Sequence, residues 1–119
     1  MKRSRILSVI ILLAAGIAVA GPRDALWAQV DEAITKGLPQ TAIALLDQII
    51  PGAMQDKAHA EATKAICLKI NLEGRIAGYD TAAMIVSLET QIAAAPEAMK
   101  PVMETVLAEW YWRYFQQNR

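Results

Sequence analysis

The sequence is poor in the residues from which most catalytic and metal sites are built. Its 119 residues include one cysteine and one histidine. A single cysteine excludes an intramolecular disulfide and any multi-cysteine metal site, and His59 has no second histidine with which to complete a zinc site. The glycines at 74 and 78 lack the following Lys-Ser/Thr of a phosphate-binding loop. We therefore assign no catalytic, cofactor-binding or metal-binding residue, and expect a protein that is not an enzyme.

The sequence also lacks a net charge, but its charges are unevenly distributed. Twelve Lys and Arg residues balance twelve Asp and Glu residues. Lys2, Arg3 and Arg5 lie in the first five positions, and no acidic residue precedes Asp24. Residues 21–119 therefore hold nine basic and twelve acidic residues. This acidic excess argues against a nucleic-acid partner, because phosphate binding needs a basic face.

Residues 1–20 have the three parts of a secretory signal peptide. The basic start is followed by the uncharged run 6–20, in which Ser8 is the only polar side chain, and the run ends in Ala18-Val19-Ala20. As a helix these fifteen residues would reach about 23 Å, which is short of the roughly 30 Å hydrocarbon core of a bilayer. We predict cleavage after Ala20 rather than a permanent anchor, and export of residues 21–119 to the periplasm or beyond.

Residues 21–119 form one predicted domain of helices, because they are rich in alanine and show no sustained apolar–polar alternation. Glycine and proline divide the domain into five helices. The expected helices are residues 24–36, 39–50 and 56–72, a fourth after an Asp80 N-cap, and a fifth that begins near Pro96 or Pro101.

The connections between these predicted helices are short. Pro51-Gly52 is expected to end the second helix, and residues 74–78 are expected to form a loop. Short connections make consecutive helices antiparallel neighbours. The predicted fold is all-α, an array of antiparallel helical hairpins of tetratricopeptide-like character, although no second copy follows at a 34-residue period.

Aromatic residues are concentrated at the end of the sequence. Five of the seven lie between residues 110 and 115. Because successive residues turn by 100° on a helix, the five rings cannot share one face. We expect Trp110 and Tyr114 to point inward, Tyr111 to lie near the edge, and Trp112 to point elsewhere. A protein partner, or a continuation of the same polypeptide, would then cover the exposed rings.

The remaining polar residues have unremarkable expected roles. On a helix His59 and Thr63 share a face, and we expect a solvent-facing histidine. Cys67 lies in an apolar stretch and is interpreted as a buried, unreactive thiol. Glu109 and Arg113 have the spacing of a favourable helical ion pair. The other acidic residues of the last segment, Glu97 and Glu104, are expected to face solvent.

Several segments resemble, in order, the N-terminal region of large bacterial alpha-2-macroglobulin-like proteins. The resemblance covers roughly residues 26–119. Its motifs are Trp27-x-x-Val30-Asp31, Lys36-Gly37-Leu38-Pro39-x-x-Ala42, Lys64-Ala65 and the terminal Leu107-Ala108-Glu109-Trp110-Tyr111-Trp112-Arg113-Tyr114-Phe115-Gln116-Gln117-Asn118-Arg119.

The resemblance implies an exported protease trap, in which a helical region precedes many β-sandwich macroglobulin domains. Many members of the family form a covalent link through a thioester made by a C-x-E-Q motif. Here Cys67 is followed by Leu68-Lys69-Ile70, so the thioester role does not carry over to it. No bait segment is located either. The resemblance therefore implies that residues 21–119 are the N-terminal part of a longer inhibitor chain.

Two functions remain open from the sequence. In the first, the domain is the non-catalytic helical preface of an alpha-2-macroglobulin-like endopeptidase inhibitor and docks on the following domains or on a protein partner. In the second, it is a free-standing periplasmic interaction module that binds a peptide or partner helix between its hairpins. The wide apolar stripe of residues 43–50 favours the second. Membrane contact is expected only through an uncleaved signal peptide.

Overall fold

The protein folds as five helices with no strand over residues 21–119, the part of the chain that the computed structural model describes. The predicted all-α array of helical hairpins is confirmed. The signal-peptide prediction concerns residues 1–20 and lies outside the described residues. The helices are α2 (Asp24–Thr35), α3 (Pro39–Gln55), α4 (His59–Ala77), α5 (Thr81–Ala94) and α6 (Lys100–Gln117).

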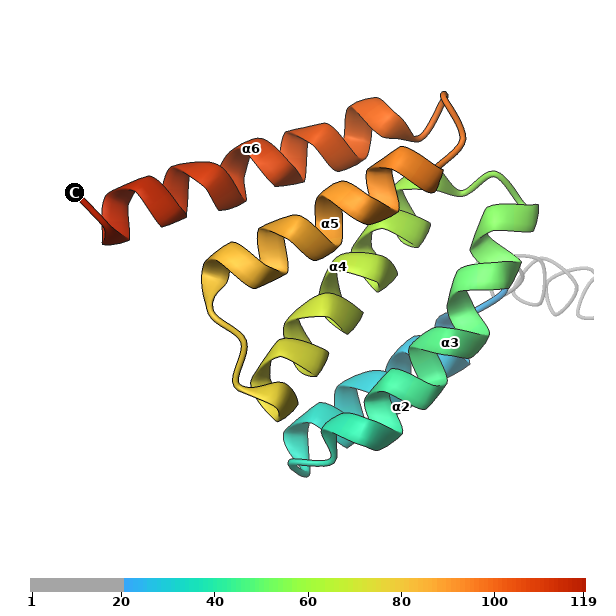
Figure 1. The fold of residues 1–119 in the computed structure, drawn as a ribbon. Coiled ribbons are helices and arrows are strands. Elements are labelled where there is room, and N and C mark those ends of the chain that lie inside the picture. The colour runs from blue at the N-terminus through green and yellow to red at the C-terminus, as the bar shows by residue number, and fades with distance from the viewer. Residues whose placement is uncertain (1–20) are drawn as a thin grey trace, which may run out of the picture.

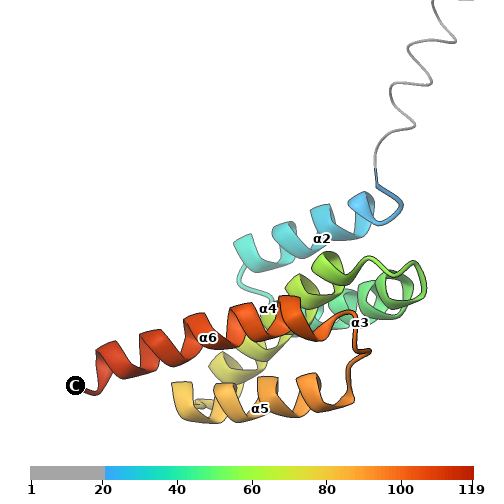
Figure 2. The same ribbon diagram turned by 90° about the horizontal axis from the view of Figure 1, so that it is seen from above.

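The helices pack in chain order around α4 (Figure 1). The helices α2 and α3 form one hairpin, and α5 and α6 form another. Between them, α4 contacts α3 on one side and both α5 and α6 on the other. The second view shows that the end of α6 projects past the start of α5 (Figure 2).

Two successive turns have the same hydrogen-bond geometry. At the end of α2, Gly37 has a φ of 71°, and the backbone N–H of Leu38 donates to the carbonyl of Ala33 at 2.8 Å. At the end of α3, Lys57 has a φ of 56°, and the N–H of Ala58 donates to the carbonyl of Ala53 at 2.9 Å. Both are Schellman-type helix ends, which need a left-handed residue.

The predicted end of the second helix at Ile50 is wrong, because α3 continues through Pro51 and Gly52 to Gln55. The missing N–H of Pro51 costs one helical hydrogen bond, but the next turn buries Ala53 completely in the core. A Cβ on Gly52 would lie 3.2 Å from Nη1 of Arg23. The glycine therefore permits a close contact with Arg23 and does not end the helix.

The predicted bounds of the third helix are also wrong at both ends. It begins at His59 and not at Asp56, because the left-handed Lys57 forms a turn there. It continues to Ala77 through the segment expected to be a loop, and ends at Gly78, whose φ is 71°. Gly74 is buried inside the helix, where a Cβ would lie 3.2 Å from the Met84 side chain. This glycine permits the close approach of α5.

The starts of the last two helices follow the sequence more closely. The Asp80 carboxylate caps α5 as predicted and accepts a hydrogen bond from the N–H of Ala83 at 2.9 Å. Of the two prolines considered for the fifth helix, Pro101 lies in the first turn of α6, whereas Pro96 lies in the connection before it.

The core consists of two hydrophobic clusters, and α4 contributes to both. One cluster joins α2 and α3 to Ala65 and Leu72 of α4. The other joins the end of α3, α5 and α6 to Ala62, Cys67 and Ile70 of α4. The two sets of residues lie on different sides of α4, and each set includes an alanine, which lets the neighbouring hairpin approach closely.

Candidate functional site

A group of exposed aromatic side chains lies on the last two turns of α6. We define the aromatic surface as Tyr111, Trp112 and Phe115. Trp112 is 60 % exposed and Phe115 is 55 % exposed. Their rings stack with centroids 5.8 Å apart and an interplanar angle of 25°. Large exposed rings that pack on each other are typical of protein-interaction surfaces.

Only Trp110 of the terminal aromatic residues enters the core, where it is 8 % exposed. The expectation that Tyr114 also points inward is wrong, because this residue is 39 % exposed. Its position on the helix faces the core side, but the neighbouring start of α5, where the Thr81 hydroxyl lies 3.2 Å from the side-chain oxygen of Gln117, does not cover the ring. The predicted outward position of Trp112 is confirmed.

Two polar contacts hold the side chains of this part of α6. The Tyr111 hydroxyl donates a hydrogen bond to Glu89 of α5, and this bond raises the pKa of the phenol. Arg113 and Glu109 form the ion pair predicted from their spacing. Because both contacts are exposed, we expect neither to stabilise the fold strongly. The bond with Glu89 orients the Tyr111 ring.

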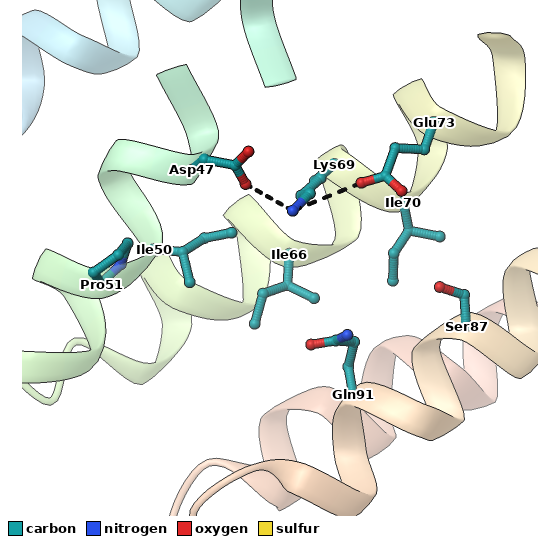
Figure 3. A pocket seen from close by; sticks show the side chains of 9 residues that line it. All are labelled: Asp47, Ile50, Pro51, Ile66, Lys69, Ile70, Glu73, Ser87 and Gln91. Carbon is teal, nitrogen blue, oxygen red and sulfur yellow. Dashed lines mark ion pairs between the residues drawn. The ribbon is translucent and has the colours of Figure 1, made fainter. Parts of the chain in front are cut away.

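A second candidate site is a groove of about 330 Å³ that lies over α4 (Figure 3). The helices α3 and α5 form its walls, with α4 between them. The floor is apolar and comes from α4, where Ile66 is half-buried and Ile70 is buried with 7 % of its surface exposed. The groove is lined in full by Asp47, Ile50, Pro51, Ile66, Lys69, Ile70, Glu73, Ser87 and Gln91.

Ion pairs lie along the edge of this groove that is farther from α5 (Figure 3). Nζ of Lys69 lies 2.7 Å from a carboxylate oxygen of Asp47 and 3.8 Å from one of Glu73. The hydrogen bond with Asp47 raises the pKa of Lys69, so the ammonium stays charged. The Lys69–Glu73 spacing is visible in the sequence, but the site as a whole is not, because Asp47 comes from another helix.

A third cluster of charges ties α2 to the start of α4. Arg23 contacts Glu61 and Asp56, and Nε1 of Trp27 donates a hydrogen bond to Glu61 at 2.8 Å. Nζ of Lys64 lies 4.3 Å from the centre of the Trp27 ring. The donors and acceptors of this cluster are paired with one another within the fold, so we assign the cluster a structural role.

The residues considered for chemistry in the sequence lie on α4 without a catalytic arrangement. The expectation that His59 faces solvent is wrong. The residue is half-buried, and its Nδ1 is buried without a hydrogen-bond partner. Thr63 is buried nearby on the same face, and its hydroxyl also has no partner. The predicted burial of Cys67 is confirmed. Burial raises the pKa of its thiol to about 11, which disfavours the reactive thiolate.

Over residues 21–119, no three His, Cys, Asp or Glu side chains gather in an arrangement that could hold a metal ion. Among the helices of the same range, none is long and apolar enough to cross a membrane. The chain was also compared with protein-family models, with curated proteins and with solved structures, and none of the three comparisons gave a match.

Proposed function

We propose that this chain is a non-catalytic docking module that binds another protein through the aromatic surface of α6. The observation that carries the proposal is the stacked and exposed pair of Trp112 and Phe115. Aromatic side chains contribute much of the binding free energy in protein interfaces when a partner excludes water from them. The Tyr111–Glu89 hydrogen bond supports the proposal, because a ring held in place loses less conformational entropy on binding.

The resemblance to alpha-2-macroglobulin-like proteins suggests a specific form of this function. In that form the module is the exported helical preface of an endopeptidase inhibitor, and the aromatic surface binds a β-sandwich macroglobulin domain of the same polypeptide. The acidic excess of residues 21–119 and the signal-like residues 1–20 are compatible with such an exported protein. Protease trapping itself would then be carried out by other parts of the inhibitor.

Hydroxyl-radical footprinting of two samples tests the docking function. One sample is the native protein isolated from its own cells, and the other is the purified 119-residue chain. We expect Trp112 and Phe115 to be oxidised several-fold more slowly in the native sample. Tyr79 is the control, because it is 57 % exposed and lies outside the aromatic surface. Equal oxidation of Trp112 in both samples would contradict the docking proposal.

The mass of the native product distinguishes the two forms of the function. An antibody raised against residues 21–119 is used on the exported fraction. A product several times larger than 13.0 kDa supports the inhibitor preface. A product of 13.0 kDa or less supports the alternative, a free-standing periplasmic interaction module. The groove between α3 and α5 favours this alternative, since an apolar floor with polar side chains on both sides is suited to binding a peptide.

A further inference from the structure

The groove over α4 has an acidic rim. Three charged side chains line it, and Lys69 neutralises one of the two carboxylates. Asp47 is 52 % exposed and Glu73 is 48 % exposed, so both keep oxygens free to accept further hydrogen bonds. The groove therefore carries one net negative charge, and an incoming carboxylate would be repelled.

The opposite wall supplies neutral hydrogen-bonding groups. The side chains of Ser87 and Gln91 come from α5 and border the groove across from the ion pairs (Figure 3). A hydroxyl and an amide both donate and accept hydrogen bonds, which are the bonds that a peptide backbone needs. Between the two walls, the floor of Ile66 and Ile70 offers an apolar contact.

We propose that this groove binds a short peptide segment in which a Lys or Arg lies beside a large apolar side chain. The apolar side chain packs on Ile66 and the exposed edge of Ile70, and Ser87 and Gln91 bond the peptide backbone. Because Lys69 already lies between the two carboxylates, the cationic group binds the free oxygens on the exposed sides of Asp47 and Glu73. The charge of the groove selects a basic segment, and the acidic excess of residues 21–119 attracts the same segment at longer range. This proposal rests on the alternative function, in which the groove binds a peptide, and it does not require the aromatic surface.

Matched peptides test the charge selection. The probes are acetyl-Ala-Leu-Lys-Leu-Ala-amide and two versions in which Lys is replaced by norleucine or Glu. They are titrated into the ¹⁵N-labelled chain, and binding is read from the shifts of the backbone amides. We expect the Lys peptide to shift amides of Ile66, Lys69, Ser87 and Gln91 and to bind roughly three- to tenfold more tightly than the norleucine peptide. The Glu peptide should bind most weakly.

Variants of the protein locate the binding. Asp47→Asn and Glu73→Gln each remove one carboxylate and should each weaken the Lys peptide roughly two- to fivefold. The norleucine peptide should be nearly unaffected by either change. Glu104→Gln is the matched control on exposed α6, and should change neither affinity. Ser87→Tyr should block the groove, whereas Thr90→Tyr on the exposed side of α5 should not.

Each result decides the proposal. Equal binding of the Lys and Glu peptides would overturn it, as would shifts confined to α6 or a complete lack of shifts at millimolar peptide. Lys-peptide binding that survives both carboxylate variants would also overturn it. A Trp112→Ala and Phe115→Ala double variant separates the two surfaces. Unchanged peptide binding in this variant supports the groove, whereas lost binding places the peptide on α6 and leaves only the docking proposal.

Discussion

Arg23 and Glu61 lie 38 positions apart in the sequence and form a two-point ion pair. Nε of Arg23 donates to one carboxylate oxygen at 2.9 Å, and Nη2 donates to the other at 2.7 Å. The pair fastens the start of α2 to the first turn of α4, across the glycine at position 52. Paired donors of this kind fix direction as well as distance, so the pair sets the position of the first hairpin on α4.

Removal of the Glu61 carboxylate should destabilise the protein. The Glu61→Ala variant leaves Arg23 and Nε1 of Trp27 without their acceptor, and we expect it to lose about 1–3 kcal/mol of the free energy of unfolding. Urea denaturation followed by circular dichroism measures this loss. Glu32→Ala is the matched control, because the Glu32–Lys36 pair is exposed and should contribute less than about 0.5 kcal/mol. Equal losses in the two variants would contradict the structural role of the cluster.

The Glu61 carboxylate should also make the free energy of unfolding depend on pH. Hydrogen bonding to Arg23 lowers the pKa of Glu61 below its ordinary value of 4.5. Its stabilisation is therefore fully present above pH 4.5 and is lost as the pH falls through the lowered pKa. Thermal unfolding between about pH 6 and about pH 3 should show a smaller loss of stability for Glu61→Gln than for the unmodified protein. A parallel decline of both proteins over that interval would argue against this assignment.

Truncation of Trp110 should destabilise the protein far more than truncation of Trp112. Trp110→Ala empties a buried position in the core and should cost about 3–5 kcal/mol. Trp112→Ala removes an exposed ring and should change stability by less than about 0.5 kcal/mol. Chemical denaturation of both variants checks this contrast. A large loss for Trp112→Ala would mean that the ring stabilises the isolated fold, which would weaken its assignment to a docking surface.

Replacement of Lys57, which has a left-handed backbone conformation, by glycine should stabilise the protein. Lys57 has a φ of 56°, a conformation that costs a side-chain-bearing residue about 1–2 kcal/mol. The equivalent position of the preceding turn is already Gly37. We expect Lys57→Gly to stabilise the protein by about 0.5–1 kcal/mol, after the greater entropy of glycine in the unfolded chain is subtracted. Calorimetric unfolding that shows a lower midpoint for this variant would contradict the geometry of the turn.

The sequence predicted the number and order of the helices, because apolar spacing and caps such as Asp80 are local signals. It failed where packing between distant segments decides the outcome. Gly52 and Gly74 were interpreted as breaks, yet each lies inside a helix where another side chain approaches closely. A local pattern does not show which glycine is needed for a turn and which for a contact.

The candidate sites were predictable to different degrees. The aromatic surface could be anticipated, since five rings on consecutive turns cannot all be buried. The exposure of Tyr114 could not, because it depends on where α5 begins beside α6. The groove was beyond sequence analysis, because its charged rim joins Asp47 to a lysine on the next helix and its far wall comes from α5.

The position of α4 between the two hydrophobic clusters has a consequence for cooperativity. Ala65 and Leu72 complete one cluster, and Ala62, Cys67 and Ile70 complete the other. Neither hairpin can bury its apolar face without the same helix, and Ala53 of α3 also belongs to the cluster that buries α5 and α6. Local unfolding of the first hairpin would therefore expose one side of α4 and part of the second cluster. Residues 21–119 should therefore unfold as one thermodynamic unit, in which events at the first hairpin are felt energetically at the last.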